Sequence, residues 1–143
     1  MNCEKFDEVI KIAFFNYGQF GVKVELLSVE DKATPTPPGN WYSVSVKVEP
    51  VTTQPDPVME TWYYGGVIRH ETRPVPLGIR PINKDKLIGA CKAAEQLPVG
   101  FPLPEASANL SWPLTPLVDE PLYTFYHDDI SISVGAYSGQ VKK

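Results

Sequence analysis

The sequence predicts an α+β fold in which an antiparallel β-sheet packs against two helices. Three observations carry this prediction: an apolar stripe with helical spacing near the start, a strictly alternating strand over residues 42–48, and a second helical stripe over residues 84–96. The chain of 143 residues has the length of one domain, so we expect a single domain over 1–143.

The first segment predicts a helix over residues 3–17. Asn2 can cap this helix, and the carboxylates of Glu4 and Asp7 suit its positive first turn. Its apolar residues recur at intervals of three and four, which places them on one face. They are Phe6, Val9, Ile10, Ala13, Phe14 and Tyr17.

Residues 21–31 predict a strand with an irregularity. Apolar residues alternate there with period two, but their face changes between Leu26 and Leu27, as a β-bulge would produce. A proline-rich loop over 34–40 separates this strand from the next one, which has one apolar and one polar face. The apolar face consists of Tyr42, Val44, Val46 and Val48.

Residues 58–71 are rich in β-formers and contain Gly65-Gly66. This pair is either the turn of a hairpin or a bulge in one long strand. A proline-broken linker follows over 73–81. The sequence then predicts a helix from Lys84 to Gln96, capped by Asn83. Its apolar stripe is Leu87, Ile88, Cys91, Ala94 and Leu97.

The last part predicts three short strands over 106–112, 121–127 and 130–137, with Asp128-Asp129 as the turn between the last two. The predicted order is therefore αβββ followed by αβββ. A constant offset of 81 overlays Tyr42 on Tyr123, which suggests half-repeats over 1–72 and 82–143. Because such matches fall on cap and pattern positions, duplication and chance similarity both stay open.

The second half resembles the PepSY-like domains. The resemblance lies in the helix 84–96, in the strand Glu120-Pro121-Leu122-Tyr123-Thr124-Phe125, and in the ending Val134-Gly135-Ala136-Tyr137-Ser138-Gly139-Gln140-Val141. It implies a small α+β module with an inhibitory or ligand-binding role beside secreted peptidases or envelope proteins. The sequence departs from that family at Gly135, where the family has an acidic residue. The wider shape also resembles the cystatin and NTF2-like folds.

Composition excludes several classes of function. The net charge of −4, from 17 acidic and 13 basic residues, argues against binding to nucleic acid. No apolar run approaches the length that spans a bilayer, so we expect no membrane association.

The charged N-terminal segment is not a secretory signal, which predicts a cytoplasmic location. There, Cys3 and Cys91 are expected as free thiols, although a disulfide between them is the alternative.

No recognisable catalytic motif is present, and we expect no catalytic residue, metal or cofactor. The two histidines, His70 and His127, are too few and too far apart in sequence for the usual metal-ligand spacings. The glycine patterns of nucleotide-binding loops and the serine motif of hydrolases are missing. Cys91 lies on an apolar stripe, where a thiol is ordinarily inert.

The most unusual local feature is the run Thr61-Trp62-Tyr63-Tyr64. In a strand, Trp62 and Tyr64 share one face and Tyr63 takes the other, so both faces carry large aromatic side chains. Aromatic anchors are typical of binding surfaces. The candidate binding residues are therefore Trp62, Tyr64, Trp41 and Trp112, with ordinary core packing as the alternative interpretation.

These observations predict a non-catalytic binding or protein-interaction module, either for a protein partner or for self-association. The alternative is a small-molecule pocket enzyme of the NTF2-like type. Such an enzyme would need at least two ionisable groups in one cavity. The available candidates are His70, Glu60, His127 and Asp128.

Overall fold

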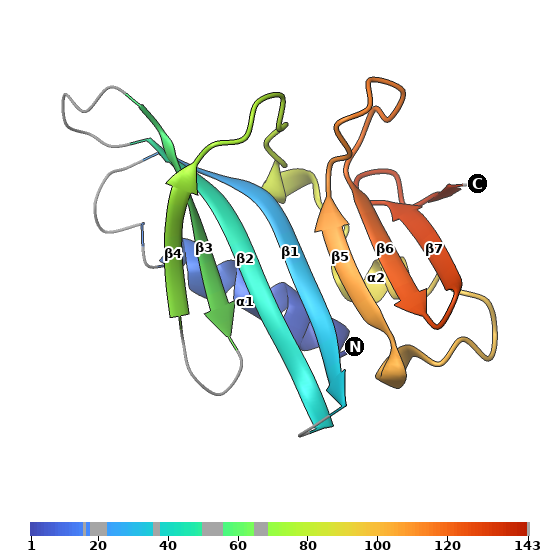
Figure 1. Ribbon diagram of the computed structural model, residues 1–143. Coiled ribbons are helices and arrows are strands. Elements are labelled where there is room, and N and C mark those ends of the chain that lie inside the picture. The colour runs from blue at the N-terminus through green and yellow to red at the C-terminus, as the bar shows by residue number, and fades with distance from the viewer. Residues whose placement is uncertain (16, 18–22, 36–37, 50–55, 65–68, 143) are drawn as a thin grey trace.

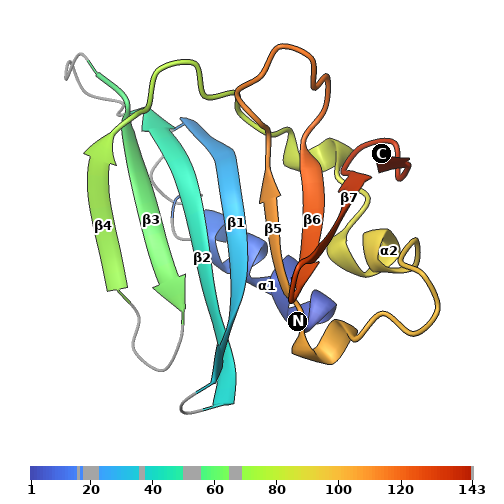
Figure 2. The same cartoon turned by 45° about the vertical axis from the view of Figure 1, so that its right-hand side comes forward.

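The protein forms one eight-stranded antiparallel sheet with both helices on the same face (Figures 1 and 2). The computed structural model describes residues 1–15, 17, 23–35, 38–49, 56–64 and 69–142. The predicted α+β class, an antiparallel sheet packed against two helices, is confirmed. Within the described residues, no helix has the length and apolar character needed to cross a membrane.

The strand order is β4-β3-β2-β1-β5-β6-β7-β8. In the first half, α1 (Cys3–Phe15) precedes β1 (Lys23–Pro35), β2 (Pro38–Glu49), β3 (Val58–Tyr64) and β4 (Arg69–Pro74). In the second half, the 3-10 helix η1 (Lys84–Lys86) and α2 (Ala90–Ala94) precede a 3-10 helix η2 (Leu103–Glu105), β5 (Ser107–Ser111), β6 (Leu122–His127), β7 (Ile130–Gly135) and β8 (Val141–Lys142).

Helix α1 forms where the sequence predicts it, but it ends at Phe15 and not at the predicted residue 17. The side chain of Asn2 accepts a hydrogen bond from the backbone N–H of Lys5 at 3.0 Å, which caps the first turn. The apolar stripe packs on the sheet, because burying it removes apolar surface from water. The fully or nearly buried members of the stripe are Phe6, Val9, Ile10 and Ala13.

The predicted β-bulge is also present. The register of β1 against β2 pairs Leu26 with Val46 and then Ser28 with Ser45, so Leu27 is the extra residue. The bulge lets Leu26 and Val29, three positions apart, both lie on the helix-covered face and become fully buried. Without the bulge, one of them would point to the opposite face.

Two sequence-based expectations about the first hairpins need correction or refinement. The loop predicted over 34–40 is shorter, because β1 runs to Pro35 and β2 begins at Pro38. Pro35 and Pro38 fit there because, among the described residues, only β1 and β2 pair at this end of the sheet, where a missing N–H costs little. Further on, β3 and β4 pair antiparallel, which excludes one long strand; Gly65-Gly66 itself lies outside the described residues.

The continuous helix predicted over 84–96 was wrong. Asn83 does cap a helical turn, with its side chain accepting from the N–H of Asp85, but η1 ends at Lys86. The backbone is extended at Leu87, and the N–H of Ile88 donates to the carbonyl of Ala136 at 2.9 Å. Gly89 then has a φ of +86°, which interrupts any helix, and α2 contains only five residues. Contacts with the last strands therefore outweigh the helical pattern.

The two cysteines form a disulfide, so the expectation of free thiols was wrong. Cys3 begins α1 and Cys91 lies in α2, and the two Cα atoms are 4.9 Å apart. The short helix α2 lies against α1 on the same face of the sheet, which brings the two thiols together. The link closes a loop that includes β1 to β4.

A buried carboxylate secures the end of the second half. Glu120 accepts hydrogen bonds from the N–H groups of Tyr137 and Ser138 and from the hydroxyl of Ser138, and its other close partner is Lys142 at 2.8 Å. A Cβ at Gly135 would lie only 2.6 Å from the Glu120 carboxylate. Glycine is therefore required at 135, because the carboxylate approaches the backbone there.

The two halves have matching topology. Each contributes helical turns followed by four strands, so the predicted αβββ order was one strand short in both halves. The central strands β1 and β5 pair antiparallel, and the remaining strands extend outward from them in the same order. At the predicted offset of 81, the equivalents Tyr42 and Tyr123 are both buried on the helix-covered face. Duplication itself stays a prediction.

The opposite face of the sheet is polar. The registers place hydroxyl side chains side by side across neighbouring strands. Two of these pairs are hydrogen-bonded: Ser45 with Thr61 at 2.8 Å, and Thr124 with Ser133 at 2.9 Å. Tyr63 also lies on this face and donates its hydroxyl hydrogen to Glu71 at 3.2 Å.

We expect that replacing both Cys3 and Cys91 by serine lowers the free energy of unfolding by about 2–5 kcal/mol, because the unfolded chain regains the entropy of a long loop. Urea unfolding followed by circular dichroism measures this change. Reduction of the native protein should reproduce the loss, whereas the reductant should not affect the double variant. Equal stability with and without reductant in the native protein would contradict the prediction.

We also expect acid to destabilise the protein through Glu120. Burial alone would raise the pKa of this carboxyl, but the bonds from Lys142, Ser138 and Tyr137 outweigh it and lower the pKa to about 2. A lowered folded-state pKa stabilises the fold above the unfolded value near 4.5, and that stability is lost as the pH falls toward 2. Glu120→Gln should flatten the dependence of unfolding free energy on pH between 4.5 and 2.

Candidate functional site

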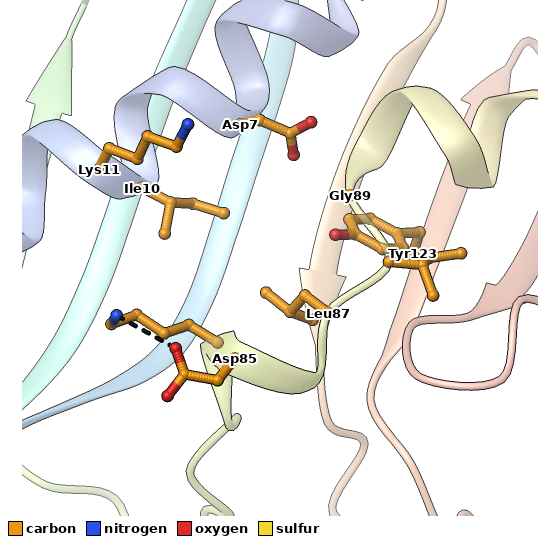
Figure 3. Close-up of a pocket in the computed structure, with 9 residues that line it drawn as sticks. Asp7, Ile10, Lys11, Asp85, Leu87, Gly89 and Tyr123 are labelled. Atoms are coloured by element: carbon orange, nitrogen blue, oxygen red, sulfur yellow. Dashed lines mark ion pairs between the residues drawn. The ribbon is translucent and has the colours of Figure 1, made fainter.

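A cleft opens on the helix-covered side of the molecule, between α1 and the segment 84–89. Its volume is about 390 Å³, within the range of small-molecule sites. Helix α1 contributes Asp7, Ile10 and Lys11. The facing segment contributes Lys84, Asp85, Leu87, Ile88 and Gly89, and β6 contributes Tyr123 (Figure 3).

The cleft exists because the helical pattern breaks at residues 87–89. A continuous helix would carry its side chains along the groove beside α1, whereas the extended backbone at Leu87 leaves space there. Gly89 brings the chain close to α1, since a Cβ at this position would lie 3.4 Å from a carboxylate oxygen of Asp7. The break and the approach together leave an opening above Tyr123.

Asp7 joins the two sides of the cleft. Its carboxylate oxygens accept from the N–H of Ala90 at 2.9 and 3.2 Å, so a side chain of α1 caps the start of α2. Burial raises the pKa of Asp7, and this effect outweighs the lowering by the N–H groups of Ala90 and Cys91 and by Lys11. Asp7 therefore has a structural role in shaping the cleft.

Tyr123 forms the buried end of the cleft. Its side chain is fully buried and packs against Phe6, with ring centroids 6.0 Å apart, while its hydroxyl points into the opening. Among the described residues, no group completes a hydrogen bond with this hydroxyl. The amide of Gly89 is near enough to lower the pKa slightly, but burial and the charge of Asp7 raise it further. The hydroxyl thus stays protonated and able to donate.

Charged side chains border the opening. The ammonium of Lys84 pairs with Asp85 at 3.5 Å and lies 5.2 Å from the ring centre of Phe14. Lys11 stands on α1, on the other side of the cleft from Asp85 (Figure 3). Such exposed ion pairs contribute little to stability, so these side chains can adjust to a ligand.

The sequence-predicted residues Trp62, His70 and Glu60 meet in a separate cluster, together with Tyr17. The indole N–H of Trp62 donates to the hydroxyl of Tyr17 at 2.8 Å, and that hydroxyl donates to Glu60. His70 stacks on Trp62, with centroids 4.3 Å apart, and its Nε2 lies 3.4 Å from Glu60. This cluster ties the end of α1 to β3 and β4.

His127 and Asp128 lie elsewhere. Four strands separate β4, which carries His70, from β6, which carries His127; at the usual spacing this is about 24 Å. The imidazole of His127 lies 3.7 Å from Glu105 and 3.5 Å from Asp128, at the predicted turn. The two histidines therefore cannot act in one cavity.

The other candidate binding residues are also dispersed. Trp41 is 39% exposed, on the face opposite Tyr42, whereas Tyr64 is half-buried beside Tyr42 on the helix-covered face. Trp112 donates to the carbonyl of Val118 at 3.0 Å, and the guanidinium of Arg80 lies 4.5 Å over its ring. The four residues Trp62, Tyr64, Trp41 and Trp112 do not form one surface.

The cleft residues were not identified from the sequence. The sequence predicts Asp7 only as a favourable charge in the first helical turn, and Tyr123 only as a residue of the strand 121–127 that matches Tyr42 at the offset of 81. The cleft depends on the interruption at Gly89, which the apolar stripe of 84–96 concealed. A glycine in the middle of a predicted helix was the one available signal.

Across the described part of the chain, no three His, Cys, Asp or Glu side chains converge as a metal site requires. Comparison with known protein families, with curated proteins and with solved structures finds no match to this chain. The site must therefore be interpreted from its own geometry.

We expect Tyr17→Phe to lower the free energy of unfolding by about 1–2 kcal/mol, because Trp62 and Glu60 each lose a partner in a half-buried setting. Urea unfolding measures the effect. Tyr126→Phe is the matched control, since its hydroxyl accepts an exposed hydrogen bond from Asn109. An equal effect of the two substitutions would contradict a structural role for the cluster.

Proposed function

We propose that the protein is a small non-catalytic binding module and that it binds a small molecule in the cleft between α1 and residues 84–89. The observation that carries this proposal is the hydroxyl of Tyr123, a fully buried donor that points into the cleft without a partner among the described residues. A buried donor without an acceptor costs free energy, which a bound acceptor would recover.

The walls of the cleft support the same proposal. Ile10 and Leu87 offer apolar surface on opposite sides, and four charged side chains stand around it. Apolar surface combined with convergent polar groups is typical of small-molecule sites. Association with a protein partner or with a second copy through Trp62 and Tyr64 stays a prediction, and the bonds of Trp62 within its cluster weaken it.

The alternative, a small pocket enzyme of the NTF2-like type, has one observation in its favour. Glu60 lies within reach of both the Tyr17 hydroxyl and the imidazole of His70, which is an arrangement capable of proton transfer. These residues do not line the cleft described above. The enzyme hypothesis would be favoured if Tyr17→Phe left the free energy of unfolding unchanged, because the cluster would then have no role in stability.

The disulfide indicates in which kind of compartment the protein functions. Disulfides persist in oxidising compartments and are rare in the cytoplasm. The link between Cys3 and Cys91 therefore favours an oxidising compartment over the cytoplasmic location expected from the sequence. Such a location agrees with what the PepSY resemblance implied, and we retain that resemblance as part of the proposal.

The proposed site can be tested with N-phenyl-1-naphthylamine, an uncharged dye that fluoresces on leaving water. Leu87→Trp should fill the cleft and weaken dye binding at least about tenfold, or ~1.4 kcal/mol. Leu77→Trp is the matched control, because Leu77 is 96% exposed in the linker and should leave binding unchanged. Circular dichroism would verify the fold of both variants.

Amide chemical shifts of the native protein provide a second readout that needs no variant. Dye binding in the cleft should shift the amides of Asp7, Lys11 and Gly89, which line it. Absence of any dye binding, or shifts confined to other parts of the sheet, would refute the proposed site.

A further inference from the structure

From the donors that the cleft offers, we propose that its ligand is a compact apolar molecule carrying one carboxylate or similar anionic group; this inference rests on the binding function proposed above. The cleft combines apolar walls with a buried hydroxyl donor and lysines at the opening. The anionic oxygen would accept from Tyr123 and face Lys11, and the apolar body would lie against Ile10, Leu87 and Ile88.

The buried end of the cleft favours a ligand that carries a hydrogen-bond acceptor. Tyr123 is fully buried and its hydroxyl remains protonated, because burial and the charge of Asp7 both raise its pKa. A protonated hydroxyl can donate to a ligand oxygen, and a hydrogen bond to a charged acceptor is stronger than one to a neutral acceptor. A ligand oxygen with negative charge therefore gains most from this position.

The Asp7 carboxylate in the cleft already has a partner. Both of its oxygens accept from the N–H of Ala90, so part of its charge is directed to the start of α2. Lys11 stands on α1 at the opening, and its positive charge lowers the pKa of Asp7. These contacts reduce the repulsion that Asp7 would exert on an anion.

The opening also favours negative charge. Lys84 comes from the segment facing α1, and its pairing with Asp85 is solvent-exposed, since the Asp85 side chain is 86% exposed. An exposed pair of this kind is readily exchanged for another anion. Lys11 and Lys84 can thus both approach a ligand, whereas Asp85 can turn to water.

Three naphthalene derivatives of the same body separate the possibilities: 2-naphthoate, 2-naphthylmethanol and 2-naphthylmethylamine. Calorimetric titration should give the carboxylate an affinity about fivefold or more above that of the alcohol, with the amine weakest. Lys11→Gln should remove the preference for carboxylate over alcohol. Lys92→Gln, at an exposed position of α2 outside the cleft, should leave the preference intact.

Tyr123→Phe tests the buried donor. The substitution should lower the affinity for both the carboxylate and the alcohol about fivefold or more, because both ligands accept a hydrogen bond from the hydroxyl. It should not reduce stability, since the hydroxyl that it removes has no partner among the described residues.

The outcomes distinguish this inference from the function on which it rests. Binding of the alcohol or the amine at least as tightly as the carboxylate would overturn the inference and leave the binding function standing. A carboxylate preference that survives Lys11→Gln would overturn it as well. If none of the three compounds binds, the proposed function itself fails.

Discussion

The capping of α2 by Asp7 is the interaction on which the functional side of this molecule depends. Helix α2 has five residues, too few to be stable alone, so its start must be held from outside. The Asp7 carboxylate accepts the N–H of Ala90 with both of its oxygens, and the disulfide from Cys3 to Cys91 fixes the same junction covalently. Together they position Gly89 against α1 and keep the cleft open above Tyr123.

The sheet explains why this junction lies near the middle of the molecule. The central strands β1 and β5 belong to different halves, and each half places its helical turns on the same face. The helices therefore meet beside the boundary of the two halves, where neither half alone could enclose a cavity. Ligand sites commonly form at such boundaries, because two separately built surfaces rarely fit without a gap.

Much of the fold was predictable because it follows from local patterns. Burial of apolar side chains on one face produces three of these patterns: the stripe of α1, the bulge at Leu27 and the alternation from Tyr42 to Val48. The break in the helix at Leu87 to Gly89 could not be predicted in this way. It accompanies the hydrogen bond from the N–H of Ile88 to the carbonyl of Ala136, about fifty residues later in the chain. The disulfide, and the bond between Tyr17 and Glu60, likewise depend on contacts between distant segments.

The disulfide also changes what a cut in the backbone would do. The linker between β4 and η1 contains the exposed residue Leu77, and it lies inside the loop closed by Cys3 and Cys91. A protease that cleaves there would leave two pieces joined by a covalent bond as well as by the shared sheet. The cleft, whose two walls come from opposite sides of that cut, would survive the nick as a covalently assembled unit.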